Sequence, residues 1–288
     1  MDSLIEKLDQ LKTVLKGYKR CLIAYSGGVD SVFLSYVAHQ VLGDQSLAVI
    51  ADSPSLAREE LKEALEISEQ FKFPVRVIQT EEFENESYLK NAPNRCYFCK
   101  SALFEKLKSI VDAENYDVIA YGENLDDVGD IRPGAVAAEK YSIQAPLKQC
   151  QFSKADVREA SRQMGLPTAE KPQMACLSSR IPHGDPVTEK KLKMVEQSEL
   201  FLKKLGFYGP RVRCHELSFG FLARIEIQPG DWKLISNFDL ASEIDSTFKG
   251  FGFCYSTFDL GGYKSGGRST QENISGRLKD KNLASKST

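Results

Sequence analysis

The sequence of 288 residues contains no long hydrophobic run, and this absence excludes a large class of proteins. No stretch approaches the roughly 20 apolar residues that a helix needs to span a bilayer. The first residues alternate charged with apolar side chains and contain no hydrophobic segment of the kind found in signal peptides. We therefore expect a cytoplasmic protein that has no part in a membrane.

The sequence also lacks an excess of positive charge. Its 38 Lys and Arg residues are balanced by 40 Asp and Glu residues, which gives a formal net charge of −2. Because proteins that bind long phosphate backbones usually carry a basic surface, this balance argues against binding to nucleic acid. The hydrophobic content of 42% is that of an ordinary globular chain, and the length predicts two domains of roughly 150 residues each.

The sequence also lacks the even number of cysteines that a fully disulfide-bonded protein would have. The seven cysteines are an odd number in a chain without an export signal, which argues against a disulfide framework and favours reduced thiols or metal-thiolate chemistry. Cys96 and Cys99 form the one C-x-x-C pair. Cys21 lies in a predicted strand and is expected in the core. Three other cysteines have no ligand spacing and are expected to be structural: Cys150, Cys214 and Cys254.

Short apolar runs alternate with helix-length stretches over residues 1–178. The strand-like runs lie at 21–25, 47–51, 74–78 and 117–121. This alternation predicts an α/β domain with a doubly wound, mainly parallel sheet.

Residues 179–268 repeat the mixture of helices and strands on a smaller scale. We expect helices at 187–205 and 231–249, with strands at 210–215, 221–227 and 253–260. These elements predict a second, smaller α/β domain that binds the substrate or forms oligomer contacts. Residues 269–288 are polar and rich in serine and lysine, and are expected to form a flexible tail.

The most informative segment is Ser26-Gly-Gly-Val-Asp-Ser31, which follows a predicted buried strand and opens a helix. A glycine turn in this position presents backbone N–H groups and a helix N-terminus to an anion. Gly27 and Gly28 have no Cβ, so a phosphate can approach the backbone, while Ser26 and Ser31 add hydroxyl donors. The segment lacks the Gly-Lys-Ser/Thr ending of a Walker A motif, so it has no lysine for the β- and γ-phosphates. A glycine-rich turn without a ligand is the simpler alternative.

This hexapeptide resembles the signature of the PP-loop ATP pyrophosphatases, which cleave ATP between the α- and β-phosphates and transfer AMP to a substrate oxygen. Ala51-Asp-Ser53 ends the second predicted strand, where such folds receive adenine and ribose, and Gly122-Glu-Asn-Leu-Asp-Asp127 follows a later one. The resemblance implies ATP binding by eight residues: Ser26, Gly27, Gly28, Asp30, Ser31, Ser53, Gly122 and Asp127.

Three carboxylates lie close together in the sequence after the fourth predicted strand: Asp126, Asp127 and Asp130. Mg²⁺ prefers a few carboxylates together with water and phosphate oxygens. We therefore expect Mg²⁺ to bind here with ATP, and a solvated acidic loop is the alternative.

Four further segments together resemble one family of this superfamily, the LarE-type sulfur insertases: Asp130-Ile-Arg-Pro-Gly134, Cys176-Leu-Ser-Ser-Arg-Ile-Pro182, Arg211-Val-Arg213 and Phe258-Asp-Leu-Gly-Gly262. That family converts the carboxylates of pyridinium-3,5-biscarboxylic acid mononucleotide to thiocarboxylates, during synthesis of the nickel-pincer nucleotide cofactor of lactate racemase. The resemblance covers about residues 5–268. It implies a homo-oligomeric, ATP-dependent sulfurtransferase that adenylates a carboxylate for attack by a sulfur nucleophile.

Cys176 matches the cysteine that this family uses to donate sulfur. In some members this cysteine gives up its own sulfur and remains as dehydroalanine. In members with a pattern like this one, three cysteines hold a 4Fe–4S cluster, which the resemblance assigns here to Cys96, Cys99 and Cys176. A zinc ion bound by these cysteines and His183 is an alternative, as are uncoordinated thiols with a sacrificial Cys176.

Arg211 and Arg213 lie two residues apart in a predicted strand, so their side chains share a face. Paired guanidinium groups suit a phosphate, and the resemblance supports this pair as ligands for the phosphate of the substrate. Arg180, next to two serines, is expected to complete the anion pocket. Ordinary surface salt bridges are the alternative. Glu226 and Asp231 match a family site that takes a divalent metal.

Two other functions remain open. Some PP-loop enzymes that thiolate tRNA also carry a C-x-x-C pair and a distant cysteine around an Fe–S cluster, although the charge of −2 and the lack of an RNA-binding module count against this function here. A non-catalytic regulator that binds nucleotide and metal would leave the arginine pair and Cys176 unexplained.

Overall fold

The computed structural model describes residues 3–129, 133–172 and 175–263. The chain divides into two compact units: the first comprises Met1–Tyr88 and Asn94–Ala175, and the second comprises Leu89–Pro93 and the chain from Cys176 onward. The unit changes at residues 175 and 176, three residues before the predicted boundary. The predicted tail, 269–288, lies outside the described residues.

The short segment Leu89–Pro93 belongs to the second unit, although it lies within the predicted first domain. The side-chain nitrogen of Asn91 donates to the carbonyls of Pro182 and Asp185, at 2.7 and 2.9 Å, and the side chain is completely buried. Because one buried amide satisfies carbonyls about ninety residues further on, the segment is held there by hydrogen bonds that local sequence patterns do not reveal.

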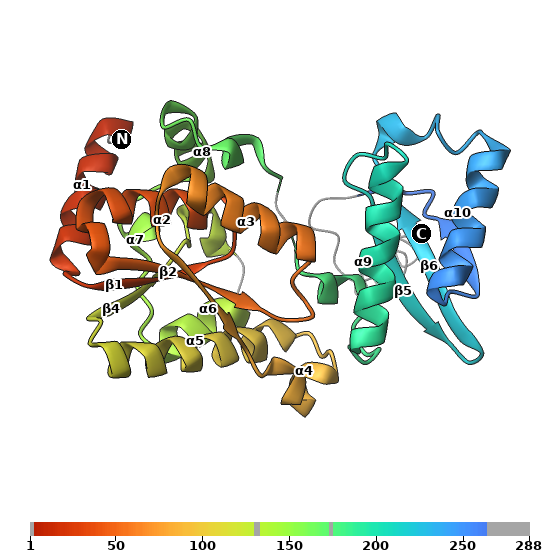
Figure 1. Ribbon diagram of the computed structural model, residues 1–288, viewed down its shortest axis with the longest axis horizontal. Helices are drawn as coiled ribbons and strands as arrows, with labels where there is room; N and C mark the ends of the chain where they lie inside the picture. Colours follow the sequence, from red (N-terminus) through yellow and green to blue (C-terminus); the bar gives the residue numbers. More distant parts are fainter. Residues whose placement is uncertain (1–2, 130–132, 173–174, 264–288) are drawn as a thin grey trace, which may run out of the picture. The chain divides into compact units, whose positions relative to one another are not determined.

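The first unit is built on a four-stranded sheet with the order β3-β2-β1-β4 and with every neighbouring pair parallel (Figure 1). The strands are β1 (Cys21–Tyr25), β2 (Ser46–Asp52), β3 (Val75–Gln79) and β4 (Val118–Tyr121). Every residue of β1 is buried, as expected for a central parallel strand covered on both faces. The predicted mainly parallel sheet is confirmed.

Helices cover both faces of this sheet (Figure 1). Alternate residues of β1 face opposite ways. Ile23 packs with α1, α2, α3 and α8 in one core, whereas Leu22 packs with α5 and α6 in another. The helices of this unit are α1 (Leu4–Gly17), α2 (Val29–Leu42), α3 (Arg58–Phe71), α5 (Arg95–Glu114), α6 (Pro133–Lys140), α7 (Pro146–Gln149) and α8 (Lys154–Gln163). The short helix α4 (Glu86–Leu89) ends on the first residue of the segment that belongs to the second unit.

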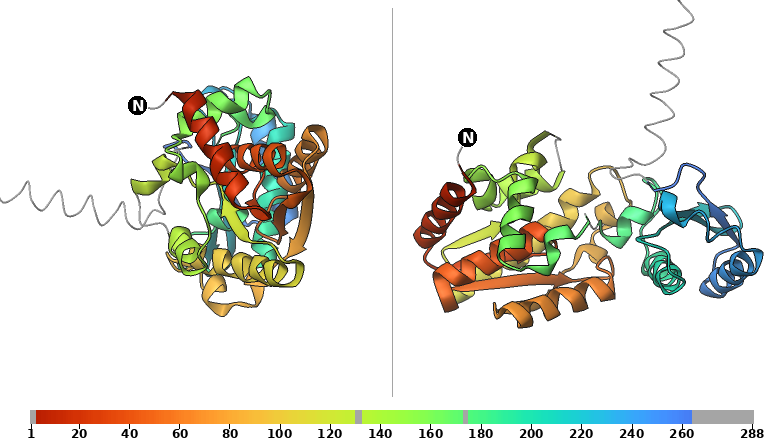
Figure 2. Two further views of the ribbon diagram at one scale, coloured as in Figure 1. Left: turned by 90° about the vertical axis from the view of Figure 1, so that its left-hand side faces the viewer. Right: turned by 90° about the horizontal axis from the view of Figure 1, so that it is seen from above.

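The second unit is smaller and contains a three-stranded sheet with the order β5-β6-β7. Strands β5 (Arg211–Leu217) and β6 (Gly220–Glu226) form an antiparallel hairpin, and β7 (Tyr255–Phe258) pairs parallel to β6. Helices α9 (Glu189–Lys204) and α10 (Phe238–Phe251) pack together on one side of the sheet (Figure 2). The predicted second α/β domain is thus present.

The start of α10 differs from the sequence prediction. The helix expected at 231–249 begins at Phe238, because the side chain of Asn237 accepts hydrogen bonds from the backbone N–H groups of Asp239 and Leu240. Such an N-cap fixes where a helix begins. Residues Pro229–Asp231 form a separate 3₁₀ turn.

Within the described ranges, every helix is too short or too polar to cross a membrane.

Candidate functional site

The glycine-rich segment forms the turn between β1 and α2, at the carboxyl edge of the parallel sheet. Gly28 is the N-cap of α2, and it has no side chain with which to cap the first N–H groups of the helix. The hydroxyl of Ser31 accepts a hydrogen bond from the backbone N–H of Ser26 at 3.1 Å and donates to the carbonyl of Gly28 at 3.1 Å. Ser31 therefore shapes the loop from inside, and the helix N-terminus remains available to an anion.

Gly27 can be occupied only by glycine. Its φ of +70° lies in the left-handed region, and a Cβ at this position would lie 2.8 Å from the Cβ of Ala64 on α3. Real Cβ atoms do not approach so closely, and a left-handed conformation costs a residue with a side chain about 1–2 kcal/mol. The loop therefore lies directly against α3.

The segment after β4 meets the same loop. A Cβ on Gly122 would lie 3.0 Å from backbone atoms of Asp30 and Ser31, so β4 ends in close contact with the first turn of α2. Asn124 donates from its side chain to the carboxylate of Asp30 at 3.1 Å. The structure thus brings Gly122 and Asp30, two residues predicted to bind ATP, to one place.

The predicted Mg²⁺ ligands have other partners in this structure. Asp126 accepts a hydrogen bond from the backbone N–H of Lys154 at 2.7 Å, and Asp127 accepts one from the backbone of Asn124 at 3.2 Å. Asp130 lies outside the described residues. A carboxylate that accepts one hydrogen bond still has lone pairs for a metal ion. These contacts therefore orient Asp126 and Asp127, and metal binding by them stays a prediction.

Ser53 follows β2 and belongs to a small buried polar network. Its hydroxyl lies 2.8 Å from that of Ser55, which in turn contacts the carboxylate of Glu82 at 3.4 Å. Arg58 donates to the carbonyl of Ser53 at 2.9 Å. Ser55, Glu82 and Arg58 were not identified from the sequence. The contact between Ser55 and Glu82 spans 27 residues and has no local signal, and the contacts of Ser55 and Arg58 with Ser53 belong to a loop without a recognisable motif.

Two lysines reach the loop from outside it. Lys154, at the start of α8, pairs with the carboxylate of Asp30 at 2.5 Å. Lys171 lies 3.2 Å from the carbonyl oxygen of Gly27 and 2.8 Å from the carboxylate of Glu63. The loop has no lysine of its own, and the fold supplies two. Neither was predicted, since the Gly27–Lys171 contact spans 144 residues and has no local signal.

The paired cysteines lie in the first two turns of α5. Cys96 is exposed and Cys99 is half-buried, and one helical turn separates them. Burial lowers the pKa of the neighbouring Lys100, and the adjacent thiols of Cys99 and Cys96 oppose that shift. Lys100 lies over the aromatic rings of Tyr121 and Phe104, at 5.4 and 5.7 Å from the ring centroids.

The remaining cysteines differ in how far their thiols are exposed to solvent. All seven lie in described residues, and each is a thiol and not half of a disulfide. Cys176 is exposed and is the N-cap of a 3₁₀ turn in the second unit. Burial raises the pKa of Cys21 and of Cys214 to about 12, which keeps both protonated and unreactive. Among the described residues, no group of three or more His, Cys, Asp or Glu side chains is gathered into a metal site.

The three predicted substrate arginines lie in the second unit, and carboxylates engage all of them. Arg180 is 2% exposed and pairs with Glu199 through two nitrogens, at 2.9 and 3.3 Å. Arg211 lies 3.8 Å from the same carboxylate. Arg213 pairs with both carboxylate oxygens of Glu226, at 3.0 and 2.9 Å. These are largely buried pairs, unlike the surface salt bridges considered as an alternative.

Glu226 and Asp231, the predicted divalent-metal ligands, have protein partners. Besides Arg213, Glu226 contacts Arg224 at 3.1 Å, so two guanidinium groups neutralise its charge. Asp231 accepts the backbone N–H of Tyr208 at 2.9 Å. Asp259, in the segment Phe258-Asp-Leu-Gly-Gly262, also pairs with Arg224.

His215 is the other notable group near these arginines. The guanidinium of Arg224 donates to its Nε2 at 3.0 Å, which requires a neutral imidazole that carries its proton on Nδ1. Burial lowers the pKa of His215, and the charge of Arg224 lowers it further.

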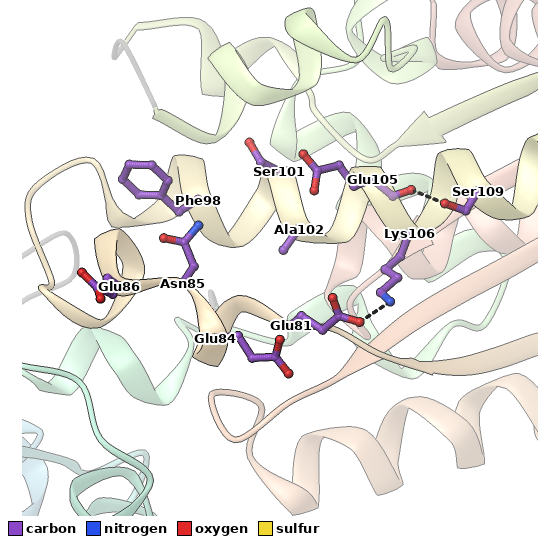
Figure 3. Close-up of a pocket in the computed structure, with 10 residues that line it drawn as sticks. All are labelled: Glu81, Glu84, Asn85, Glu86, Phe98, Ser101, Ala102, Glu105, Lys106 and Ser109. Atoms are coloured by element: carbon purple, nitrogen blue, oxygen red, sulfur yellow. Dashed lines mark hydrogen bonds and ion pairs between the residues drawn. The ribbon is translucent and has the colours of Figure 1, made fainter.

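A pocket of about 640 Å³ lies elsewhere in the first unit, between α5 and the segment at 81–86 (Figure 3). Its lining is acidic, and Lys106 pairs with Glu81 across it. Since clustered carboxylates repel phosphate, the loop at Gly27 suits a nucleotide better than this pocket does. The lining residues are Glu81, Glu84, Asn85, Glu86, Phe98, Ser101, Ala102, Glu105, Lys106 and Ser109.

Known proteins resemble the chain over nearly its whole length. The NAD synthase family profile matches residues 5–102. An uncharacterised protein of Synechocystis sp. is 42% identical over 90% of this chain and 96% of its own length. The pyridinium-3,5-bisthiocarboxylic acid mononucleotide synthase of Lactiplantibacillus plantarum is 30% identical over 92% and 95% of the two chains. An uncharacterised protein of Methanocaldococcus jannaschii is 31% identical over 91% and 98%.

Replacing Gly27 with alanine tests the geometry of the loop. We expect Gly27→Ala to weaken binding of MgATP at least about tenfold, because the new methyl group forces the loop away from α3 and adds a strained φ. Isothermal titration calorimetry measures the affinity. Gly17→Ala is the control, because an added Cβ there meets nothing within 4 Å. Binding by Gly27→Ala at wild-type strength would contradict the geometry.

The lowered pKa of His215 makes the stability of the protein pH-dependent. The unfolded chain takes up a proton at His215 near pH 6.5, whereas the folded protein resists it to lower pH. The contribution of His215 to the free energy of unfolding is therefore complete above about pH 6.5 and falls as the pH drops below that value. We expect His215→Gln, whose amide oxygen can still accept from Arg224, to flatten this acid-side loss in urea titrations between pH 7 and 5. An unchanged pH slope would refute the assignment.

Proposed function

Since the chain belongs to the family of the pyridinium-3,5-bisthiocarboxylic acid mononucleotide synthase, within the PP-loop superfamily, we propose that it is an ATP-dependent sulfurtransferase that acts on pyridinium-3,5-biscarboxylic acid mononucleotide. The observation that carries this proposal is the similarity over 92% of the chain, which includes both the glycine-rich loop and the arginine-rich second unit. The pyridinium mononucleotide is small and anionic, which agrees with local cationic groups in a chain of net charge −2. A tRNA substrate has no comparable support.

The first step is activation of a carboxylate. A carboxylate oxygen of the substrate attacks the α-phosphorus of ATP, and pyrophosphate leaves. The N–H groups of Gly27 and Gly28 and the N-terminus of α2 bind the departing phosphates, where the helix dipole favours negative charge. Asp126 and Asp127 bind Mg²⁺ in this proposal, because carboxylates and phosphate oxygens are its preferred ligands.

The second step is sulfur transfer. A sulfur nucleophile attacks the carbonyl carbon of the acyl adenylate, AMP leaves with the C–O bond electrons, and a thiocarboxylate remains. The step is favourable because AMP is a far better leaving group than the oxide ion that an unactivated carboxylate would have to expel. We assign Cys176 to this step because it is exposed and matches the family motif. As a cluster ligand it would hold the group that delivers sulfide to the acyl adenylate. As a sacrificial donor it would itself attack and form a thioester, and elimination with loss of the Cα proton would then break the Cβ–S bond, leaving the thiocarboxylate and dehydroalanine.

The phosphate of the substrate binds to the arginines of the second unit in this proposal. Support comes from the way Glu199 and Glu226 hold Arg180, Arg211 and Arg213 in fixed orientations. Guanidinium groups that are already oriented lose little side-chain entropy when they bind a phosphate.

Cys96, Cys99 and Cys176 would hold a 4Fe–4S cluster in this proposal, and the cluster would carry the sulfur for transfer. Exposed or half-buried thiols fit that role chemically, because thiolate is the ligand of such clusters and the first two lie one helical turn apart. When bound through three cysteines, the cluster keeps one iron that can carry an exchangeable sulfide. The competing possibilities are a sacrificial Cys176 and a zinc ion bound with His183, whose Nδ1 lies 3.1 Å from the carbonyl of Asn91.

An anaerobic iron and sulfide assay tests the source of sulfur. We expect about four irons per chain in wild-type protein, and their loss in Cys96→Ala, because one ligand of the cluster is removed. Cys254→Ala is the matched control, since this half-buried thiol should not affect the iron content. Active protein without iron would exclude the cluster, and dehydroalanine at position 176 after turnover would show the sacrificial route. In either mechanism Cys176→Ala should lose sulfur transfer and keep ATP-dependent adenylation.

A further inference from the structure

The carbonyl group of Gly27 has a charged partner that is remote in the sequence. The ammonium of Lys171 lies 3.2 Å from this oxygen and 2.8 Å from the carboxylate of Glu63 on α3, and the lysine side chain is only 11% exposed. Its backbone is held as well, since Arg158 donates to the carbonyl of Lys171 at 2.8 Å. The ammonium is therefore held in one place by the surrounding fold.

The position of this ammonium determines the direction of a neighbouring N–H group. In a planar trans peptide the C=O and the N–H point in opposite directions. The carbonyl of Gly27 and the N–H of Gly28 belong to the same peptide, so an ammonium that binds the carbonyl turns the N–H the other way. A charged donor on the carbonyl also polarises the peptide and makes its N–H a stronger donor.

This peptide needs such a restraint because both of its residues are glycines. Glycine adopts left-handed and right-handed conformations with similar ease, so a Gly-Gly peptide can rotate at little cost. The contact with Ala64 restrains the Cα of Gly27, yet it does not select which way the peptide plane faces. The hydroxyl of Ser31 binds the carbonyl of Gly28, which is the next peptide along the chain.

We propose that Lys171, held by Glu63, is a positioning residue that locks the Gly27–Gly28 peptide with the N–H of Gly28 turned toward the pyrophosphate portion of ATP. The inference rests on the proposed ATP binding by this loop, and not on the identity of the acceptor or of the sulfur donor. Lys171 acts through the peptide, so its removal should weaken binding of the β- and γ-phosphates and spare the binding of AMP.

Calorimetric titration with three probes, magnesium pyrophosphate, MgATP and AMP, tests this lock. We expect Lys171→Met to weaken binding of pyrophosphate and MgATP about tenfold, the scale of one hydrogen bond to a charged group, and to change AMP binding less than about twofold. Lys171→Arg should restore most of the affinity, because a guanidinium can also donate to the carbonyl and pair with Glu63. The control is Lys62→Met, which removes an exposed lysine that pairs with Glu66 on the same helix.

Glu63→Gln separates a lock from a direct phosphate ligand. If Lys171 locks the peptide, loss of its counter-ion should weaken pyrophosphate binding, and the double variant should bind no more weakly than Lys171→Met alone. If Lys171 instead binds phosphate directly, release from Glu63 should tighten binding, which would overturn the proposal. Equal losses for AMP and pyrophosphate, or no loss for either, would also overturn it. Wild-type protein that binds MgATP but transfers no sulfur would contradict the proposed function and leave the lock intact.

Discussion

The candidate ATP site depends on the close approach of Gly27 to α3. A methyl group at Gly27 would meet Ala64 at 2.8 Å, and a methyl group at Gly122 would meet the first turn of α2 at 3.0 Å. Two missing side chains therefore allow β1, α2, α3 and the end of β4 to converge at the carboxyl edge of one parallel sheet, which is where ligands of such folds bind. Every other group of the site is positioned relative to this contact.

The charges of both units come from residues that are far apart in the sequence. In the first unit, Lys154 and Lys171 reach the loop with carboxylate partners, Asp30 and Glu63, which compensate the lysine charges while no phosphate is present. In the second unit, Glu199 and Glu226 do the same for the arginines. A buried charge without such a partner costs several kcal/mol, so the carboxylates explain how a cluster of cations can fold before an anionic substrate arrives.

The sheet and the glycine-rich turn could be predicted because their signals are local. Strand and helix periodicity predicted the four parallel strands, and the glycine turn between the first of them and the following helix could be read directly from Ser26–Ser31. The partners of Gly27 and Arg180 could not be predicted, because Lys171 and Glu199 lie on other elements that only the tertiary fold brings to them. The family resemblance predicts a metal ligand at Glu226; the fold adds two arginines beside this carboxylate, and metal binding there stays a prediction. Whether Cys96, Cys99 and Cys176 share one cluster is likewise a question of tertiary arrangement, and it stays a prediction.

The central claim is that the loop at Gly27 serves to adenylate a carboxylate of the pyridinium mononucleotide. Substrate labelled with oxygen-18 in its carboxylates tests this claim directly, with the AMP analysed by mass spectrometry after turnover. Adenylation joins a substrate oxygen to the α-phosphorus, and that oxygen leaves with AMP when sulfur displaces it. We expect one labelled oxygen in each AMP, with pyrophosphate as the other product. Unlabelled AMP, or ADP with phosphate, would contradict the claim.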